Sequence, residues 1–252
     1  MSFSEWMEKR RARKRLRQIE RHKKGIKNRY GYGEDRQSAV AFFQDLGGQD
    51  GALGLLERFM VIIDKTIKDE EEKEHLAKIL VSMGHDIVPA IEEYIHRKDA
   101  SNVPITWPLK ILEQVCEPSE AVDVLVRALE IMGTSYTREP ERKVLLVSQL
   151  AEFEDERVVP TLVPFLHDHR DEVQVEALDA LVRRADERAR EPMLKLLIDE
   201  ETPMRLRAAV AESLQQLGWT VKGYRKKVEE VLPEGLGVDR VGRVKGRWTH
   251  GT

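Results

Sequence analysis

Residues 158–181 read VVPTLVPFLHDHRDEVQVEALDAL, and this stretch gives the clearest indication of the fold class. Its first part is apolar at helical spacing and contains Pro160 in the position that suits the first turn of a helix. Asp168 then marks a tight turn, and Val173 begins a second stretch with helical periodicity that is rich in Ala and Leu. The segment therefore predicts a helical hairpin.

The same two-helix pattern recurs five times, at a spacing of about 34 residues. One hairpin of this size cannot bury its apolar face alone, so stacked neighbours must supply the core. The sequence predicts an all-α chain, a right-handed α-solenoid of about five hairpins. The expected units cover residues 52–83, 87–115, 121–153, 158–185 and 189–217.

Residues 156–218 resemble HEAT repeats, and residues 52–115 do so to a lesser degree. In that family, Pro begins the first helix, an Asp lies in the turn, and Val-Arg and paired alanines follow in the second helix. Pro192, Asp199 and Arg207 match this pattern, whereas Gln174 stands where Arg is expected. The resemblance implies that Asp199 meets Arg207 and that second helices line a concave surface. Tetratricopeptide repeats have a similar period, but none of these units contains their Trp, Leu-Gly, Tyr, Ala, Phe and Pro pattern.

The hydrophobic positions of the repeats predict which side chains form the core. The expected core residues are Leu55, Leu56, Phe59, Leu76, Ile79, Leu80, Ile91, Ile95, Leu112, Leu125, Leu129, Leu146, Leu150, Leu162, Leu166, Ala177, Leu181, Leu197, Val210 and Leu214.

Charge is segregated along the chain, although the formal net charge is only −3. Residues 1–33 carry a net charge of +9, residues 34–218 carry −16, and residues 219–252 carry +4. We therefore predict three parts: a basic helical arm and hinge (1–33), the solenoid (34–218), and a capping helix with a short irregular basic tail (219–252). The arm helix is expected from about residue 4 to residue 26. After Pro233, disorder is favoured, with a brief extended ribbon at residues 241–245 as the alternative.

The composition limits the compartment and the chemistry of the protein. Cys116 is the single cysteine, which excludes an intrachain disulfide and a cysteine-based zinc cluster. Neither a signal peptide nor a run of about 18 apolar residues occurs, so the predicted location is cytoplasmic.

Enzymes that resemble HEAT proteins use residues that this chain lacks. The dinuclear iron hydroxylases need His-Glu dipeptides, and the sequence contains none. The turn His167-Asp168-His169 is interpreted as solvated and capped by its Asp, and Cys116 as a buried hydrophobe rather than a lyase thiol. The acidic solenoid would repel the phosphates that a glycosylase binds. We therefore predict no enzyme activity, no catalytic residue, no metal and no cofactor.

The predicted role is a non-enzymatic adaptor or regulatory scaffold that binds a protein partner on its concave surface. The alternative is a nucleic-acid-associated or ribosome-associated protein that is anchored by its basic arm and tail, with Trp6, Tyr30 and Tyr32 available to stack on bases. Two other interpretations of the arm stay open: it docks on the acidic solenoid of its own or another chain, or it stays solvated. No membrane role is expected, because the arm lacks a bulky apolar stripe. The candidate binding residues are Arg10, Arg11, Arg13, Lys14, Arg15, Arg17, Arg21, Lys23, Lys24, Arg240, Arg243, Lys245 and Arg247.

Overall fold

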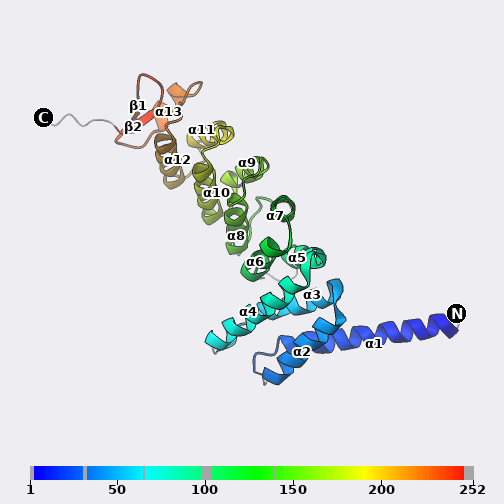
Figure 1. Ribbon diagram of the computed structural model, residues 1–252. Helices are drawn as coiled ribbons and strands as arrows, with labels where there is room; N and C mark the ends of the chain where they lie inside the picture. The colour runs from blue at the N-terminus through cyan, green and yellow to red at the C-terminus, as the bar shows by residue number, and fades with distance from the viewer. Residues whose placement is uncertain (1–2, 31–32, 65, 98–103, 139, 247–252) are drawn as a thin grey trace. The chain divides into compact units, whose positions relative to one another are not determined.

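The computed structural model describes residues 3–30, 33–64, 66–97, 104–138 and 140–246 (Figure 1). The chain divides into two compact units, residues 1–121 and residues 122–252. Helical hairpins build both units, which confirms the predicted all-α solenoid class.

Unit 1 contains two of the five predicted hairpins, preceded by a further pair of helices. The pair is α1 (Phe3–Ile26) and α2 (Gly33–Leu46). The first hairpin is α3 (Gly48–Leu56), continued by the short 3₁₀ helix η1 (Glu57–Met60), followed by α4 (Thr66–Ser82). The second is η2 (Gly84–Ile87) and α5 (Val88–Ile95), followed by α6 (Thr106–Val115).

The C-terminal half of α1 is part of the body of unit 1. Ile19 and Ile26 are buried, and the ring of His22 stacks on Phe42 of α2 with 4.0 Å between ring centroids. The predicted separation of the arm by a hinge is therefore wrong for this half of the helix. The few apolar side chains of α1 are enough to pack this half of the helix against the body, because aromatic side chains of α2 cover them. The N-terminal half of α1 extends past its neighbours (Figure 1).

Helices α2 and α3 approach each other closely at two glycines. A Cβ atom at Gly54 would fall on the ring of Phe43, and one at Gly51 would lie 2.5 Å from the Phe43 carbonyl oxygen. Phe43 itself is fully buried. Because Gly51 and Gly54 have no side chains, α3 leaves room for Phe43 of α2.

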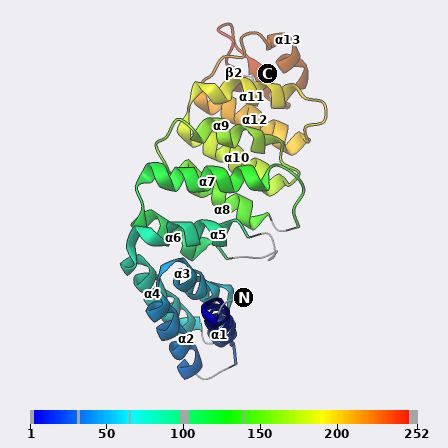
Figure 2. The same ribbon diagram turned by 90° about the vertical axis from the view of Figure 1, so that its right-hand side faces the viewer.

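Unit 2 is a regular stack of helical hairpins in two layers (Figure 2). The first layer contains most of α7 (Pro118–Met132), then α9 (Val158–Leu162) with η3 (Val163–His167), and then η4 (Glu187–Ala189) with α11 (Arg190–Ile198). The second layer contains α8 (Glu141–Ala151), α10 (Asp171–Arg184) and α12 (Met204–Leu217), and α10 packs against both of the others. The helix changes to 3₁₀ geometry after α9 because Pro164 has no amide hydrogen to donate.

The C-terminal segment is more ordered than predicted. Helix α13 (Arg225–Val231) is followed by strands β1 (Leu236–Val238) and β2 (Val244–Gly246), which pair antiparallel. Val244 is buried, and the amide of Val221 donates to the Gly242 carbonyl at 2.7 Å. The prediction of an irregular, disordered tail is therefore wrong for residues 236–246. The missed signal is the turn between the strands, in which the Asp239 carboxylate accepts from the amides of Val241 and Arg243.

All twenty predicted core residues are buried. Because these residues come from all five hairpins, this result supports the predicted apolar faces of their helices.

Candidate interaction surfaces

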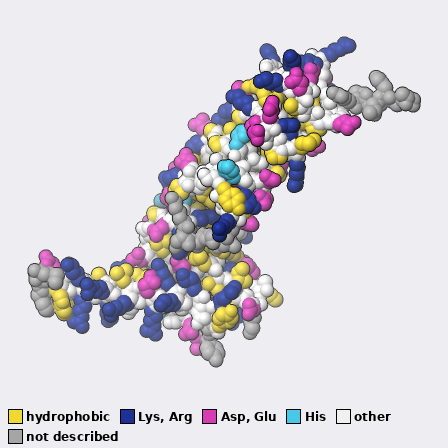
Figure 3. Space-filling view, turned by 180° about the vertical axis from the view of Figure 1, so that it is seen from behind, with side chains coloured by type: hydrophobic (Ala, Val, Ile, Leu, Met, Phe, Trp, Pro, Cys, Tyr) yellow, Lys and Arg dark blue, Asp and Glu magenta, His cyan; other side chains and the backbone are white. Residues whose placement is uncertain are grey.

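The predicted basic residues form two sets, one in each unit. Those between Arg10 and Lys24 all lie on α1, and all except the half-buried Lys23 are exposed. In Figure 3, Lys and Arg side chains line this helix. Arg240, Arg243 and Lys245 lie on or beside the β-hairpin of unit 2. Arg247 falls outside the described residues.

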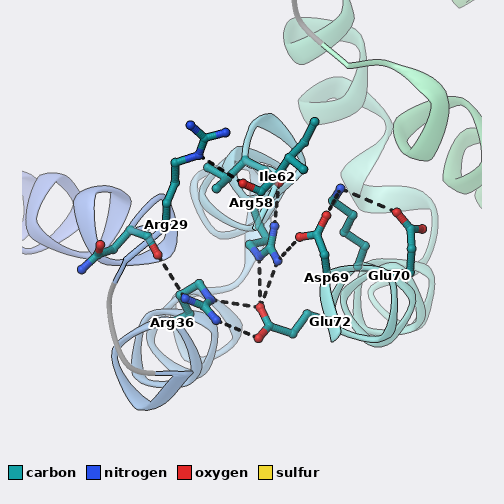
Figure 4. Close-up of polar contacts among 10 residues, drawn as sticks. Arg29, Arg36, Arg58, Ile62, Asp69, Glu70 and Glu72 are labelled. Atoms are coloured by element: carbon teal, nitrogen blue, oxygen red, sulfur yellow. Dashed lines mark hydrogen bonds and ion pairs between the residues drawn. The ribbon is translucent and has the colours of Figure 1, made fainter. Parts of the chain in front are cut away.

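A network of buried charges holds α2, η1 and α4 together, and we call it the unit 1 ion network. Its members are Arg36, Arg58, Asp69, Glu72 and Lys73. Arg58 is 2% exposed, and its Nη2 atom donates to Asp69 Oδ1 at 2.6 Å and to Glu72 Oε2 at 3.0 Å (Figure 4). Lys73 Nζ donates to Asp69 Oδ2 at 2.6 Å. Sequence periodicity gave no signal of this network, because its residues are charged and lie on several elements.

Arg36 links α2 and the end of α1 to the same network. Its Nε and Nη2 atoms donate to the two carboxylate oxygens of Glu72 at 3.0 and 2.9 Å, which is a bidentate pair. Its Nη1 atom donates to the backbone carbonyl of Asn28 at 3.1 Å. The turn after α1 is thereby fixed to α4.

Three acids of unit 1, Asp69, Glu72 and Glu57, are stabilised in their charged forms. Burial raises the pKa values of Asp69 and Glu72, but hydrogen bonds from Lys73 and Arg58 to Asp69, and from Arg36 and Arg58 to Glu72, outweigh it. Both pKa values are lowered as a net result. Glu57 behaves in the same way: burial raises its pKa, and Lys27 at 2.9 Å and Arg97 at 2.7 Å more than compensate.

A groove of about 400 Å³ lies between α2 and α4 beside this network. Its walls include Val40 and Gln44 of α2, and Glu71, His75 and Leu76 of α4. Arg36 and Arg58 of the network also line the groove, and both are already paired with acids. In the part of the chain that the structure describes, no group of three or more His, Cys, Asp or Glu could hold a metal ion.

Each second helix of unit 2 exposes side chains on its layer. Leu145 of α8, Asp179 of α10 and Glu212 of α12 are exposed, and the side chain of Arg183 lies 3.7 Å from Glu152 and 3.5 Å from Glu176. Val175 of α10 is half-buried. The face therefore carries a few partly exposed apolar side chains among exposed acids. In protein interfaces, apolar side chains form the centre and charged groups lie at the rim.

The turns between hairpins in unit 2 repeat an Asp-Glu-Arg sequence. The Asp155 carboxylate accepts from the amide and guanidinium of Arg157, and Asp186 accepts in the same way from Arg188. These bonds lower the pKa of each Asp to about 2. Each Arg also reaches back to the preceding part of the stack, since Arg157 pairs with Asp123 and Arg188 donates to the Glu156 carbonyl at 2.9 Å.

Helices α8 to α11, most of α12 and the Asp-containing turns between them lie in the region that matches a known family. Residues 134–215 match the HEAT repeats family. This segment consists of HEAT repeats. Among solved structures, human deoxyhypusine hydroxylase in complex with glycerol matches with a TM-score of 0.30 and 13% sequence identity, over 85% of this chain and 93% of that one. None of the curated proteins compared with the chain matches it.

In the HEAT repeats, the predicted pair of Asp199 and Arg207 has a different geometry. Arg207 Nη2 donates to the backbone carbonyl of Asp199 at 2.8 Å and not to its carboxylate, which accepts from the Glu201 amide. Gln174 Nε2 donates to the backbone carbonyl of Asp168 at 2.8 Å. Gln174 therefore makes the same contact with its turn as Arg207 makes in the next repeat. A carbonyl acceptor needs a donor of suitable length but no positive charge.

Asp168 caps its HEAT turn as predicted, but the turn is not solvated at this residue. Its carboxylate is buried, and it accepts from the Arg170 amide at 2.9 Å and from Lys143 Nζ at 2.7 Å. Lys143 also donates to the Ser135 carbonyl at 2.7 Å and so fixes the long connection that precedes α8. The Asp168 carboxylate is thus committed to structure rather than to a metal.

Cys116 is half-buried, and its thiol donates to the Leu112 carbonyl at 3.1 Å. Burial raises the pKa of this thiol to about 11, which disfavours the reactive thiolate. Trp107 stacks on Phe59 with 5.9 Å between ring centroids, and Trp219 is buried, so both act in packing. Within the described ranges, no helix is long and apolar enough to cross a bilayer.

Proposed function

We propose that the protein is a non-enzymatic adaptor that binds a protein partner on the second helices of its HEAT repeats. The observation that carries this proposal is the exposed face of α8, α10 and α12, where Leu145, Asp179 and Glu212 lie outside a fully packed core. HEAT repeats commonly mediate protein interactions through such surfaces.

The chemistry of the face suggests the chemistry of the partner. Asp179, Glu212 and Glu172 are exposed acids, and half-buried Val144 and Val175 lie on the same helices. A complementary partner would offer Lys or Arg around a small apolar centre. The steering effect of these acids would make association faster at low salt.

Reversal of charge on this face tests the proposal. Full-length protein, the double variant Asp179→Arg/Glu212→Arg and the matched control Glu130→Arg/Glu187→Arg would each capture partners from the native lysate after nuclease treatment. The control changes the same number of exposed acids on first helices or their turns. Loss of defined proteins only with Asp179→Arg/Glu212→Arg supports the proposal, and equal recovery by all three proteins contradicts it.

A further inference from the structure

One face of α1 contains six basic side chains and no acidic one. Successive residues of an α-helix are about 100° apart around its axis. Between Ser4 and Ile26, the arc of about 100° that points away from buried Ile19 and Ile26 contains seven residues. They are Trp6, Arg10, Arg13, Lys14, Arg17, Arg21 and Lys24, and all of them are exposed. We call this set the basic stripe.

The fold does not use the charges of the basic stripe. Further along the chain, Lys27 pairs with Glu57, and Arg36 pairs with Glu72. Among the described residues, Arg13, Lys14, Arg17, Arg21 and Lys24 form no ion pair. The three acids of α1 (Glu5, Glu8 and Glu20) lie off the stripe. Like charges three or four residues apart weaken a helix, so this arrangement is unfavourable without an external anion.

The stripe has the length and chemistry to follow a chain of phosphates. From Arg10 to Lys24 it extends about 21 Å, at 1.5 Å per residue. Four of its six cations are Arg, which can form two parallel hydrogen bonds with a phosphate. A bilayer is a poor match, because Trp6 is the only apolar side chain on this arc and an interfacial helix needs a broad apolar face.

Trp6 favours a nucleic acid over an acidic protein. Trp6 is 43% exposed at one end of the stripe, and the Arg10 guanidinium lies 5.4 Å from the centroid of its ring. An exposed indole beside a row of cations resembles the surfaces on which single-stranded nucleic acids stack their bases. Carboxylates of a protein partner would gain nothing comparable from this ring.

We propose that the basic stripe of α1 binds single-stranded nucleic acid, with its cations on successive phosphates and Trp6 stacked on one base. This site is separate from the second-helix face of the HEAT repeats. Failure of either proposal therefore leaves the other unaffected, because the variants that test them change different helices.

The test measures binding of the full-length protein to a fluorescein-labelled 20-nucleotide oligouridine by fluorescence anisotropy at several salt concentrations. The variant Arg10→Gln/Arg13→Gln/Arg17→Gln/Arg21→Gln should bind at least about tenfold more weakly near 0.1 M salt. The slope of log K against log salt should become shallower by about 2.8, which is 0.7 for each of four phosphate contacts. Circular dichroism would verify that this variant keeps its helix content, since its changes are on exposed positions.

The matched control changes four exposed arginines outside α1: Arg127→Gln/Arg138→Gln/Arg183→Gln/Arg205→Gln. It should bind the oligonucleotide as the unchanged protein does. Trp6→Ala should weaken binding about 5-fold to 150-fold while leaving the salt slope unchanged, because it removes stacking and no charge.

Several results would overturn the proposal. One is the absence of binding to oligouridine at about 50 mM salt. Others are equal affinity of the α1 variant and the control, or an unchanged affinity with Trp6→Ala. Displacement of the oligonucleotide by polyglutamate at equal charge concentration would assign the stripe to an acidic protein instead, and preference for phosphatidylserine vesicles would assign it to a membrane surface.

Discussion

The two units hold charged groups in different ways. Unit 1 buries Arg58 with Asp69 and joins them to Glu72, Arg36 and Lys73, so residues from α2, η1 and α4 share one network. Unit 2 relies on turns that repeat along the sequence, with Asp155 and Asp186 each binding the Arg two residues later. In the regular repeats, charged side chains bond to residues two positions away within a turn. In the less regular unit 1, they bond to residues on other helices that are distant in the sequence.

Replacement of Arg58, the central cation of the unit 1 ion network, should produce the largest loss of stability. In Arg58→Met, the buried Asp69 keeps Lys73 but loses its bond from the guanidinium, and Glu72 keeps only Arg36. We expect the free energy of unfolding to fall by about 3–5 kcal/mol. Urea denaturation followed by circular dichroism would measure it, with exposed Arg17→Met as the control, expected within about 0.5 kcal/mol of the unchanged protein. A loss as small as the control's would show that the network contributes little.

Acid should weaken unit 1 through the same residues. The pKa values of Glu57, Asp69 and Glu72 are lower than their ordinary values of 4.5, 3.8 and 4.5. Their stabilisation is therefore complete above those values and is lost as the pH falls through the lowered pKa values. Urea midpoints measured from about pH 7 to about pH 3 should fall less steeply in Arg58→Met than in the unchanged protein. Parallel curves for the two proteins would exclude the network as the source of acid sensitivity.

The buried ion pair of Lys143 and Asp168 in unit 2 allows a direct comparison with the unit 1 ion network. Lys143→Met leaves the Asp168 carboxylate buried with its bond from the Arg170 amide alone, and we expect a loss of about 3 kcal/mol. Hydrogen exchange should show this loss in α8 and α10, while protection of α4 is retained. The companion variant Lys143→Met/Asp168→Asn should recover part of the stability, because the buried group is then neutral. No recovery would mean that Lys143 acts mainly through its bond to the Ser135 carbonyl.

The close approach of α2 and α3 predicts a smaller effect in unit 1. Gly54→Ala places a methyl group against the ring of Phe43, and the required shift should cost about 1–3 kcal/mol. The double variant Gly54→Ala/Phe43→Leu tests the cause, because a smaller side chain at position 43 should make the alanine less harmful. Additive effects of the two changes in thermal denaturation would contradict this contact.

The repeated turns predict the smallest effect. In Asp186→Ala the amide and guanidinium of Arg188 lose their acceptor, and we expect a loss of about 1 kcal/mol. Asp186→Asn keeps an oxygen for the amide and should lose about half as much. Denaturant midpoints of the two variants would rank them. Equal losses in the two variants would show that charge matters more than the turn geometry.

The sequence predicted the repeats and the core because both follow from hydrophobic periodicity. It did not predict the unit 1 ion network, since Arg36, Arg58 and Glu72 are far apart in the chain and have no shared period. The packing of α1 on α2 was missed because Ile19 and Ile26 look sparse until the aromatic residues of α2 are placed over them. The exposed basic residues of α1 were identified from composition alone, whereas the arc that holds six of them with Trp6 and no acid can be defined only once the helix has a buried side.

The C-terminal hairpin determines how the stack of HEAT repeats ends. Strand β2 packs on α12 and helix α13 packs on α11, with Val221, Val228 and Val244 buried between them. A solenoid that ends on a bare apolar layer would offer a template on which a second copy could continue the stack. The hairpin and α13 cover the apolar surface at this end of the stack. A chain that lacks residues 219–246 would therefore tend to polymerise end to end, and the length of the solenoid is limited by a segment that is not itself a repeat.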